Sequence, residues 1–252
     1  MKLTKYTINN KNVPDGTKIA IVSDLHGNSP SAAIKFLEVE RPDYILAPGD
    51  IFEVMDGSDD RPNGAGFELL SACAQIAPTF FAPGNHDVGA TGSWLILKRS
   101  FPKAESPISK ENMERLSATG VCVLKDSYTV YDGMVFAGLG TGLVHDGCRP
   151  MVELLSEPEK HKGPKILLCH HPEYYPKYLK NSAFDLIVSG HAHGGQWRFF
   201  GRGFFAPGQG FFPKYTSGVH DNKLVVSRGL KKGDWIPRIF NPPEVVIVTV
   251  RN

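Results

Sequence analysis

Five short apolar runs, each rich in β-branched residues, stop at a side chain that can bind a metal ion. The runs cover 17–23, 43–49, 78–84, 164–169 and 184–190, and the residues that follow them are Asp24, Asp50, Asn85, His170 and His191. Runs of this length and composition indicate buried strands. Because ligand sites of open α/β sheets lie outside the carboxyl ends of the strands, we expect these five side chains to meet at one site.

Helical segments lie between the predicted strands. The spacing of apolar residues predicts helices over 64–77 and 108–118, and a further helix after Ser29, which we place at the N-cap with Pro30 at the first helical position. Alternating strands and helices are typical of an α/β architecture. No repeat or interdomain linker interrupts this pattern, so we expect a single domain over residues 1–252.

The composition excludes some classes of function. A net charge of +2 with no basic stripe gives no reason to expect a nucleic-acid partner. No stretch approaches the roughly 18 apolar residues of a membrane-spanning helix, and the first residues lack the apolar run of a signal peptide. The cysteines form no CxxC pair, so we expect free thiols in a reducing compartment: Cys73, Cys122, Cys148 and Cys169. The sequence therefore predicts a cytoplasmic protein and leaves peripheral contact with a membrane open.

The residues at the strand ends belong to a larger set of potential ligands. The set comprises Asp24, His26, Asp50, Asn85, His170, His191 and His193, with His86 beside Asn85. These are oxygen and nitrogen donors without a thiolate, which suits Mn, Fe or Zn. Seven ligands are too many for one ion but suit two divalent ions that share a carboxylate. Such two-metal sites activate a water and clamp a phosphoryl group.

The charge of this ligand set favours an anionic substrate. Asp24 and Asp50 neutralise half of the charge of two divalent ions, and the other proposed ligands are neutral when bound. The site therefore keeps a net positive charge, which attracts hydroxide and phosphate. The competing interpretation is that these residues are turn and cap residues at strand ends. Turn chemistry does not account for five histidines at these spacings.

The candidate ligands and His86 lie in short motifs that read, in chain order, DxH, GD, GNH, H and GHxH. With these motifs the chain resembles the calcineurin-like metallophosphoesterase family from Asp24 to His193. The resemblance implies a two-sheet β-sandwich flanked by helices, with a dinuclear metal centre at the strand ends. It implies that one metal is bound by Asp24, His26 and His193, the other by Asn85, His170 and His191, and that Asp50 bridges them. His86 would contact the substrate and protonate the leaving oxygen. The glycines around His191 and His193 would let the backbone turn and leave room for phosphate.

The segment after His193, together with residues 227–230 and 237–250, resembles the YkuE/YaeI-type branch of bacterial phosphodiesterases. The resemblance implies a phosphodiesterase in which a metal-activated hydroxide attacks phosphorus. Some members of that branch hydrolyse lipid-linked pyrophosphates such as UDP-2,3-diacylglucosamine, which is the first alternative. A non-catalytic metal-bound scaffold is the second, although every ligand position of the signature is filled.

Two questions stay open at this level. Glu53 and Asp87 are both candidates to orient His86. The aromatic and basic segment 197–215 suits a substrate lid, a surface for lipid headgroups or a membrane, or a stacking platform for bases. It equally suits a loop whose phenylalanines pack back on the core.

The remaining histidines carry weaker expectations. We expect His171 to pack or cap, and His161 to be a solvated loop residue. His145 and His220 lie in loops that could border the cleft. Cys169 ends an apolar run and is expected to be a small buried side chain.

Overall fold

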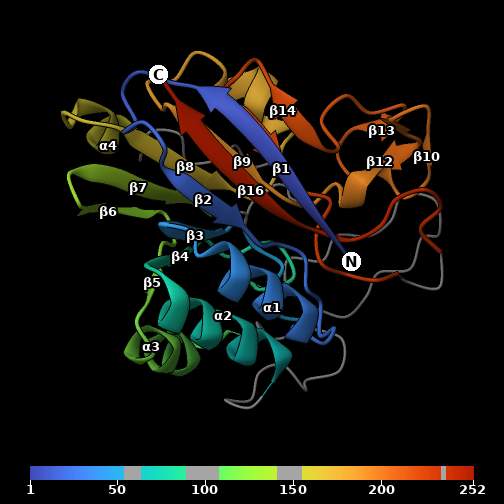
Figure 1. Cartoon of the computed structure of the whole chain (residues 1–252), viewed down its shortest axis with the longest axis horizontal. Helices are drawn as coiled ribbons and strands as arrows, with labels where there is room; N and C mark the ends of the chain where they lie inside the picture. Colours follow the sequence, from blue (N-terminus) through green and yellow to red (C-terminus); the bar gives the residue numbers. More distant parts are fainter. Residues whose placement is uncertain (54–63, 89–107, 141–154, 234–236) are drawn as a thin grey trace.

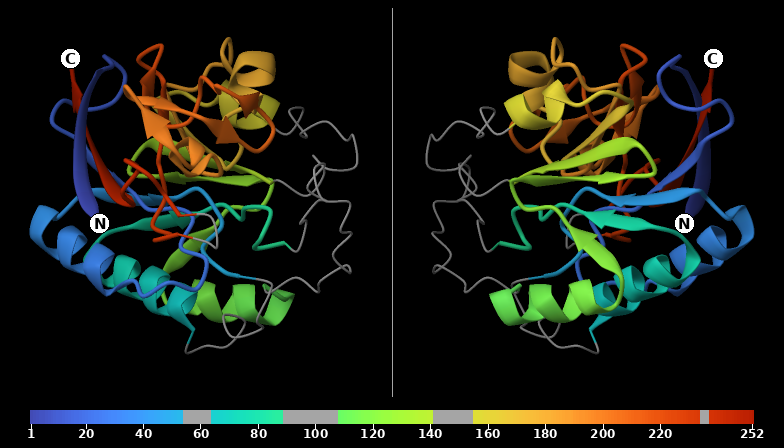
Figure 2. Two further views of the ribbon diagram at one scale, coloured as in Figure 1. Left: turned by 90° about the vertical axis from the view of Figure 1, so that its right-hand side faces the viewer. Right: turned by 90° about the vertical axis from the view of Figure 1, so that its left-hand side faces the viewer.

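The computed structural model describes residues 1–53, 64–88, 108–140, 155–233 and 237–252. It is built from two six-stranded mixed sheets that share one buried core, with helices on their outer sides (Figure 1, Figure 2). The expected α/β fold, a two-sheet β-sandwich flanked by helices, is confirmed.

The first sheet has the strand order β1-β16-β2-β3-β4-β5. Its strands are β1 (Lys2–Asn9), β16 (Glu244–Arg251), β2 (Lys18–Ile21), β3 (Tyr44–Ala47), β4 (Thr79–Phe81) and β5 (Val121–Val123). Strand β1 is parallel to β16, β16 is antiparallel to β2, and β2 to β5 are parallel to one another. The first and last strands of the chain are therefore neighbours.

The second sheet has the strand order β14-β15-β9-β8-β7-β6. Its strands are β14 (Gly218–His220), β15 (Leu224–Val226), β9 (Leu186–Ser189), β8 (Lys165–Cys169), β7 (Met134–Leu139) and β6 (Ser127–Tyr131). The four inner strands are parallel, and each edge strand is antiparallel to its neighbour.

All five strands that were predicted to lead into candidate ligands are confirmed. They are β2, β3 and β4 of the first sheet and β8 and β9 of the second. Because the strands of each group are parallel, the carboxyl ends within each group lie along one edge of their sheet.

Helices α1 (Ser31–Glu40), α2 (Ala65–Ile76) and α3 (Lys110–Ala118) cover the outer face of the first sheet (Figure 2). The short helix α4 (Ser156–Lys160) and the π-helix η2 (Tyr175–Leu179) lie on the side of the second sheet. The helices predicted over 64–77 and 108–118 are confirmed as α2 and α3, and the Ser109 hydroxyl caps α3 by accepting a hydrogen bond from the Asn112 N–H.

The predicted start of the first helix is wrong. Helix α1 begins at Ser31, and Pro30 takes the N-cap with helical backbone angles and no side-chain cap. Since Pro30 precedes the helix, Ser29 lies one position too early to cap it. The Ser29 hydroxyl instead lies 3.0 Å from the hydroxyl of Ser31.

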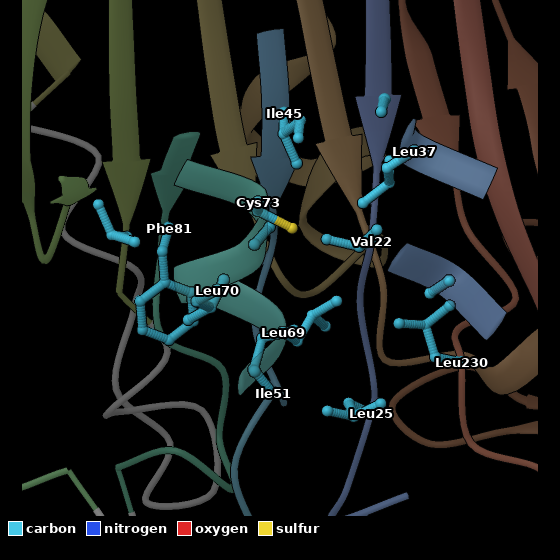
Figure 3. Close-up of a cluster of buried hydrophobic side chains, with 14 of the residues drawn as sticks. Val22, Leu25, Leu37, Ile45, Ile51, Leu69, Leu70, Cys73, Phe81 and Leu230 are labelled. Atoms are coloured by element: carbon cyan, nitrogen blue, oxygen red, sulfur yellow. The ribbon is translucent and has the colours of Figure 1, made fainter. Parts of the chain in front are cut away.

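Alternate residues of each strand face opposite layers of the molecule. Ile19 of β2 lies in the core between the two sheets, whereas Ala20 lies in the cluster between the first sheet and its helices. Figure 3 shows this second cluster, in which Ile45 of β3 lies among side chains of α2 that include Leu70 and Cys73. Burying one such side chain stabilises a fold by about 1.5–3 kcal/mol, so the clusters hold the strand ends firmly in place.

After the 3-10 turn η3 (His193–Gly195) the chain forms two short hairpins, which we call the hairpin unit (residues 196–216). They pair β10 (Arg198–Phe199) with β11 (Arg202–Gly203), and β12 (Phe205–Ala206) with β13 (Gly210–Phe211). Figure 1 shows the unit at one side of the molecule, near β14 and away from α1, α2 and α3. None of its six phenylalanines is buried, so the alternative in which they pack back on the core is excluded.

The described cysteines agree with expectation. Cys73, Cys122 and Cys169 are free thiols, Cys169 is 1% exposed, and Cys148 lies outside the described residues. In the part of the chain that the structure describes, no helix is both long enough and apolar enough to span a bilayer.

Candidate active site

The loops that follow the confirmed strands bring the candidate ligands into two groups. Donor atoms of Asp24, His26 and His193 lie within 4.8 Å of one another, as do those of Asp50, His170 and His191. Asp50 faces both groups, because its Oδ2 lies 3.0 Å from His170 Nε2 and 3.7 Å from His26 Nε2. Asp50 therefore connects the two groups of candidate ligands.

Several donor atoms in this site have no protein partner. Asp24 Oδ2, His26 Nε2 and Asn85 Oδ1 are buried and accept or donate no hydrogen bond to any described residue. Buried polar atoms of folded proteins nearly always have a partner, so three orphans in one site need an explanation. Bound divalent cations would satisfy all three, and the oxygen and nitrogen donors fit such ions.

The backbone around the ligands adopts the left-handed region that side chains other than glycine seldom enter. Positive φ angles occur at Asp24 (51°), His26 (46°), Asp50 (53°), His191 (64°) and His193 (45°). Each such residue costs about 1–3 kcal/mol, and such strain gathers at functional sites. Hydrogen bonds stabilise these backbone conformations. The His191 N–H donates to Asp24 Oδ1 over 2.8 Å, and the Leu25 N–H donates to the Asp50 carbonyl over 2.8 Å.

The glycines of the site make room for protein atoms. A Cβ on Gly190 would lie 2.5 Å from Asp24 Oδ2, and a Cβ on Gly84 would lie 2.2 Å from Asp50 Oδ1. Gly194 has a positive φ, as a turn requires, but a Cβ there would lie 2.2 Å from Asn241 Oδ1. The close neighbours of these glycines are thus the Asp24 and Asp50 carboxylates and the Asn241 amide, and the expected approach of phosphate to the glycines around His191 and His193 stays a prediction.

The open question about His86 has a geometric answer. Glu53 Oε1 lies 3.0 Å from His86 Nδ1, and Glu53 Oε2 lies 2.9 Å from His26 Nδ1. Asp87 instead accepts hydrogen bonds from the N–H groups of Asp50, Gly84 and Phe52 over 2.6, 2.6 and 2.8 Å. Glu53 therefore orients His86, and Asp87 fastens the β3 loop to the β4 loop.

Charge and burial shift the pKa values of the site histidines in different directions. Burial opposes the charged form of His170, but Asp50 outweighs it and raises the pKa of that ring to about 10. Burial lowers the pKa of His191 and of His193 well below the usual value, so both rings are neutral, as metal ligands must be. Burial also opposes the charged form of His86, but Asp50 and Glu53 outweigh it and raise the pKa of that ring. The charges of Asp50 and Glu53 therefore favour the protonated form of His86.

The other histidines lie around the site or away from it. His171 is buried, with Nδ1 3.1 Å from Glu173 Oε1, and this oxygen lies 3.9 Å from His191 Nε2. His220 Nε2 lies 3.1 Å from the Ser217 carbonyl, away from the two groups. His161 lies at the end of α4 against the Tyr128 hydroxyl, and His145 lies outside the described residues.

Three charged residues near the site were not singled out from the sequence. Glu173 lies beside His191. It follows His170 by three residues in the motif HHPE, so its closeness to the site could have been predicted from the sequence. Arg238 Nη2 lies 3.0 Å from His193 Nδ1. The Lys231 N–H donates to the Asp24 carbonyl over 2.8 Å, and its charge contributes to lowering the pKa of His26. Both cations come from the loop after β15, which no motif connected to the site.

Comparison with known proteins agrees with this geometry. The family model for calcineurin-like phosphoesterases matches residues 17–195. An uncharacterized metallophosphoesterase of Aquifex aeolicus (strain VF5) is 28% identical over 273 residues, which cover 100% of this chain and 92% of that protein. The phosphodiesterase YaeI of Escherichia coli (strain K12) is 31% identical over 193 residues, covering 72% of this chain and 62% of YaeI. The chain thus spans less than two thirds of the length of YaeI.

Solved structures are more distantly similar. A dimetal phosphatase from Danio rerio is 11% identical with a TM-score of 0.46, covering 85% of this chain and 88% of that one. The protein TT1561 of Thermus thermophilus is 18% identical with a TM-score of 0.44, covering 69% of this chain and 81% of that one. The assignment to a family rests on the sequence match over residues 17–195. The chain belongs to the calcineurin-like phosphoesterase family and is a metal-dependent phosphoester hydrolase.

Proposed function

We propose that the chain is a phosphodiesterase with a dinuclear metal centre. One divalent ion would be held by Asp24, His26 and His193, the other by Asn85, His170 and His191, with Asp50 between them. The single observation that supports this most directly is the position of Asp50 Oδ2, 3.0 Å from His170 and 3.7 Å from His26. A carboxylate oxygen that faces ligands of both groups is what a bridging ligand requires.

When bound, the two ions would supply an activated water and neutralise charge on the phosphoryl group. The chain supplies the proton for the leaving oxygen. Since Nδ1 of His86 is held by Glu53, Nε2 is the nitrogen that can face a substrate. Its ring is 27% exposed, whereas that of His26 is 1% exposed. His86 is therefore the most exposed imidazole among the candidate site residues.

Arg238 and Lys231 would add positive charge on the side of His193 and Asp24. Arg238 is held by a hydrogen bond from its Nη1 to the Arg228 carbonyl over 2.7 Å. Guanidinium groups bind phosphate oxygens strongly, because both the charge and the donor geometry match. We infer that these two residues contact the non-bridging oxygens of the substrate.

A second candidate is a pyrophosphate hydrolase that acts on a lipid-linked nucleotide. It is supported by the aromatic and basic hairpin unit, which starts directly after η3. A non-catalytic scaffold is not supported, since all seven ligand positions of the signature are filled and six of these residues lie in the two groups described above.

The metal identity and the cellular setting are parts of the same proposal. The nitrogen and oxygen donors suit Mn²⁺ as well as Fe or Zn, so we propose Mn²⁺ as the first ion to test. Free thiols at Cys73, Cys122 and Cys169 support a reducing compartment such as the cytoplasm. A shared core with members from Ile8 to Val250 supports a single domain over residues 1–252.

The experiment is hydrolysis of bis-p-nitrophenyl phosphate by chelator-stripped protein, before and after addition of Mn²⁺. We expect activity only after addition, and none in Asp50→Asn. Asp15→Asn is the matched control, because the exposed Asp15 carboxylate contacts the last residues of the chain, where it accepts a hydrogen bond from the Asn252 N–H and pairs with Arg251. Activity that survives chelation or the loss of Asp50 would contradict the proposal.

A further inference from the structure

The exposed apolar side chains of the protein are concentrated in one place. Of the large hydrophobic side chains that are exposed among the described residues, six belong to the hairpin unit or to the two residues beside it. They are Phe199, Phe200, Phe211, Phe212, Ile239 and Phe240, which we call the aromatic face. Phe200 is fully exposed, Phe240 is 77% exposed and Phe212 is 74% exposed. A contiguous apolar patch of this kind on a soluble fold marks an interaction surface.

Ring contacts and a backbone bridge connect parts of the aromatic face. The backbone of Trp197 forms a bridge with Ile239, and the rings of Phe199 and Phe240 lie 6.1 Å apart. On the other hairpin, the centre of the Phe204 ring lies 5.5 Å from the ring centres of both Phe211 and Phe212, and 5.6 Å from that of Trp197. Trp197 therefore connects the two halves, through its backbone to Ile239 and through its ring to Phe204.

The most exposed rings stand on strained backbone. Phe200, Phe212 and Phe240 have φ angles of 51°, 52° and 51°. A bulky residue in the left-handed region is an outlier, and a glycine at these turns would avoid the strain. Packing against the core does not explain these phenylalanines either, because most of the surface of each side chain is exposed. Such outliers on the surface are consistent with a function that needs the rings outside.

The unit that carries these rings is braced internally. Arg198 Nη1 donates to the Gly194 carbonyl over 2.8 Å and lies 3.1 Å from the Thr216 hydroxyl, and Arg198 Nη2 donates to the Gly201 carbonyl. The Gln209 side chain donates to the carbonyl of Tyr215 and accepts from its N–H. The rings are thus presented on a fixed support.

The positive charge of the hairpin unit favours an anionic partner. Residues 196–216 contain no aspartate or glutamate, and Arg202 and Lys214 are exposed beside the rings. Aromatic rings favour the boundary between headgroups and acyl chains, and lysine and arginine are attracted to anionic lipids. We propose that the aromatic face is a membrane-docking surface, which inserts Phe200, Phe212 and Phe240 into the headgroup region of an anionic bilayer.

Docking would place the candidate active site close to the lipid surface. The Asn241 side chain donates to the carbonyls of His193 and Gln196 over 2.7 and 3.0 Å, so the aromatic face is tied directly to a proposed ligand loop. The docking surface itself needs neither metal nor hydrolysis. Its test is therefore independent of the proposed phosphodiesterase activity.

The experiment is co-sedimentation of the full chain with large vesicles of phosphatidylglycerol and phosphatidylcholine in equal parts, or of phosphatidylcholine alone. We expect the wild type to bind the anionic vesicles, and the variant Phe200→Ser/Phe212→Ser/Phe240→Ser to bind at least tenfold more weakly. The matched control is Val39→Ser, because Val39 is 79% exposed on α1, away from the face. The melting temperature of each variant reports whether it is folded.

Each outcome decides the proposal. Loss of vesicle binding in the folded triple variant, with the control unchanged, supports it. Absence of binding by the wild type, or equal binding by the triple variant, overturns it. If the wild type ignores vesicles but forms a dimer that the triple variant loses, the face joins two copies of the chain and the proposal is wrong. Binding to single-stranded DNA in place of vesicles would contradict it in the same way.

Discussion

Glu53 joins His86 to His26: one carboxylate oxygen lies 3.0 Å from Nδ1 of His86 and the other lies 2.9 Å from Nδ1 of His26. The residue proposed to donate the proton and a residue proposed to bind metal are thus oriented by the same side chain. Carboxylates behind metal-bound histidines fix the ring and its tautomer. Changes at His86 and at Glu53 should therefore affect proton donation in different ways.

Replacing His86 by asparagine should slow substrates with a strongly basic leaving group by about 10²–10⁴-fold, the usual contribution of general acid catalysis. The loss should be much smaller for bis-p-nitrophenyl phosphate, because nitrophenolate leaves without a proton. Measured kcat values for an alkyl diester and for the nitrophenyl diester give the comparison. His161→Asn, away from the site, serves as the control. Equal losses on both substrates would show that His86 is no proton donor.

Replacing Glu53 by glutamine should move the alkaline limb of the pH–rate profile to lower pH. Glu53 and Asp50 together raise the pKa of His86 against the effect of burial. Removal of the Glu53 charge therefore lowers that pKa, and His86 loses its proton at a lower pH. Since the acid form is the active one, activity at high pH falls first. Profiles of kcat across the alkaline range test this, and an unchanged alkaline limb would rule out the coupling.

Replacing Arg238 by methionine should weaken phosphate binding by roughly 10–100-fold, in line with about 1.5–3 kcal/mol for a charged hydrogen bond. Inhibition constants for inorganic phosphate and kcat/KM for the diester report the loss, and Arg238→Lys should recover part of it. Arg251→Met is a matched control, because Arg251 pairs with Asp15 at the chain ends. If Arg238→Met binds phosphate as the wild type does, the guanidinium does not contact the substrate.

Replacing Gly190 by alanine should weaken metal binding. The new Cβ would lie 2.5 Å from Asp24 Oδ2, so the carboxylate must move, and such overpacking costs about 1–3 kcal/mol. Gly233→Ala is the matched control, because nothing lies within 4 Å of a Cβ there. Mn²⁺ titrations of both stripped variants give the affinities. Equal affinities would mean that Asp24 adapts without cost.

The strands and the gathering of ligands could be predicted because they follow from periodicity. Asp24, Asp50 and His170 each end an apolar run, and parallel strands bring such ends together wherever the sheets form. The choice between Glu53 and Asp87 could not be made from the sequence. The Asp87 carboxylate is engaged by N–H groups of Asp50 and Gly84, and these meet only when the loops after β3 and β4 are adjacent.

The contribution of the loop after β15 to the site could not be predicted from the sequence for a related reason. Arg238 and Lys231 follow His193 by many residues and reach the site through backbone contacts with Arg228 and Asp24. The hairpin unit was ambiguous because aromatic residues are equally typical of cores and of binding surfaces. Only the backbone geometry separates the two, since it turns Phe200 and Phe212 outward.

The most direct test of a bridged dinuclear centre is the number of metal ions per chain. Stripped protein is loaded with Mn²⁺, desalted, and analysed for manganese and protein, with Asp50→Asn, His86→Asn and Asp15→Asn alongside. We predict two ions per chain in the wild type, in His86→Asn and in Asp15→Asn, and one or none in Asp50→Asn. A single ion in the wild type, or two in Asp50→Asn, would contradict a dinuclear centre bridged by Asp50.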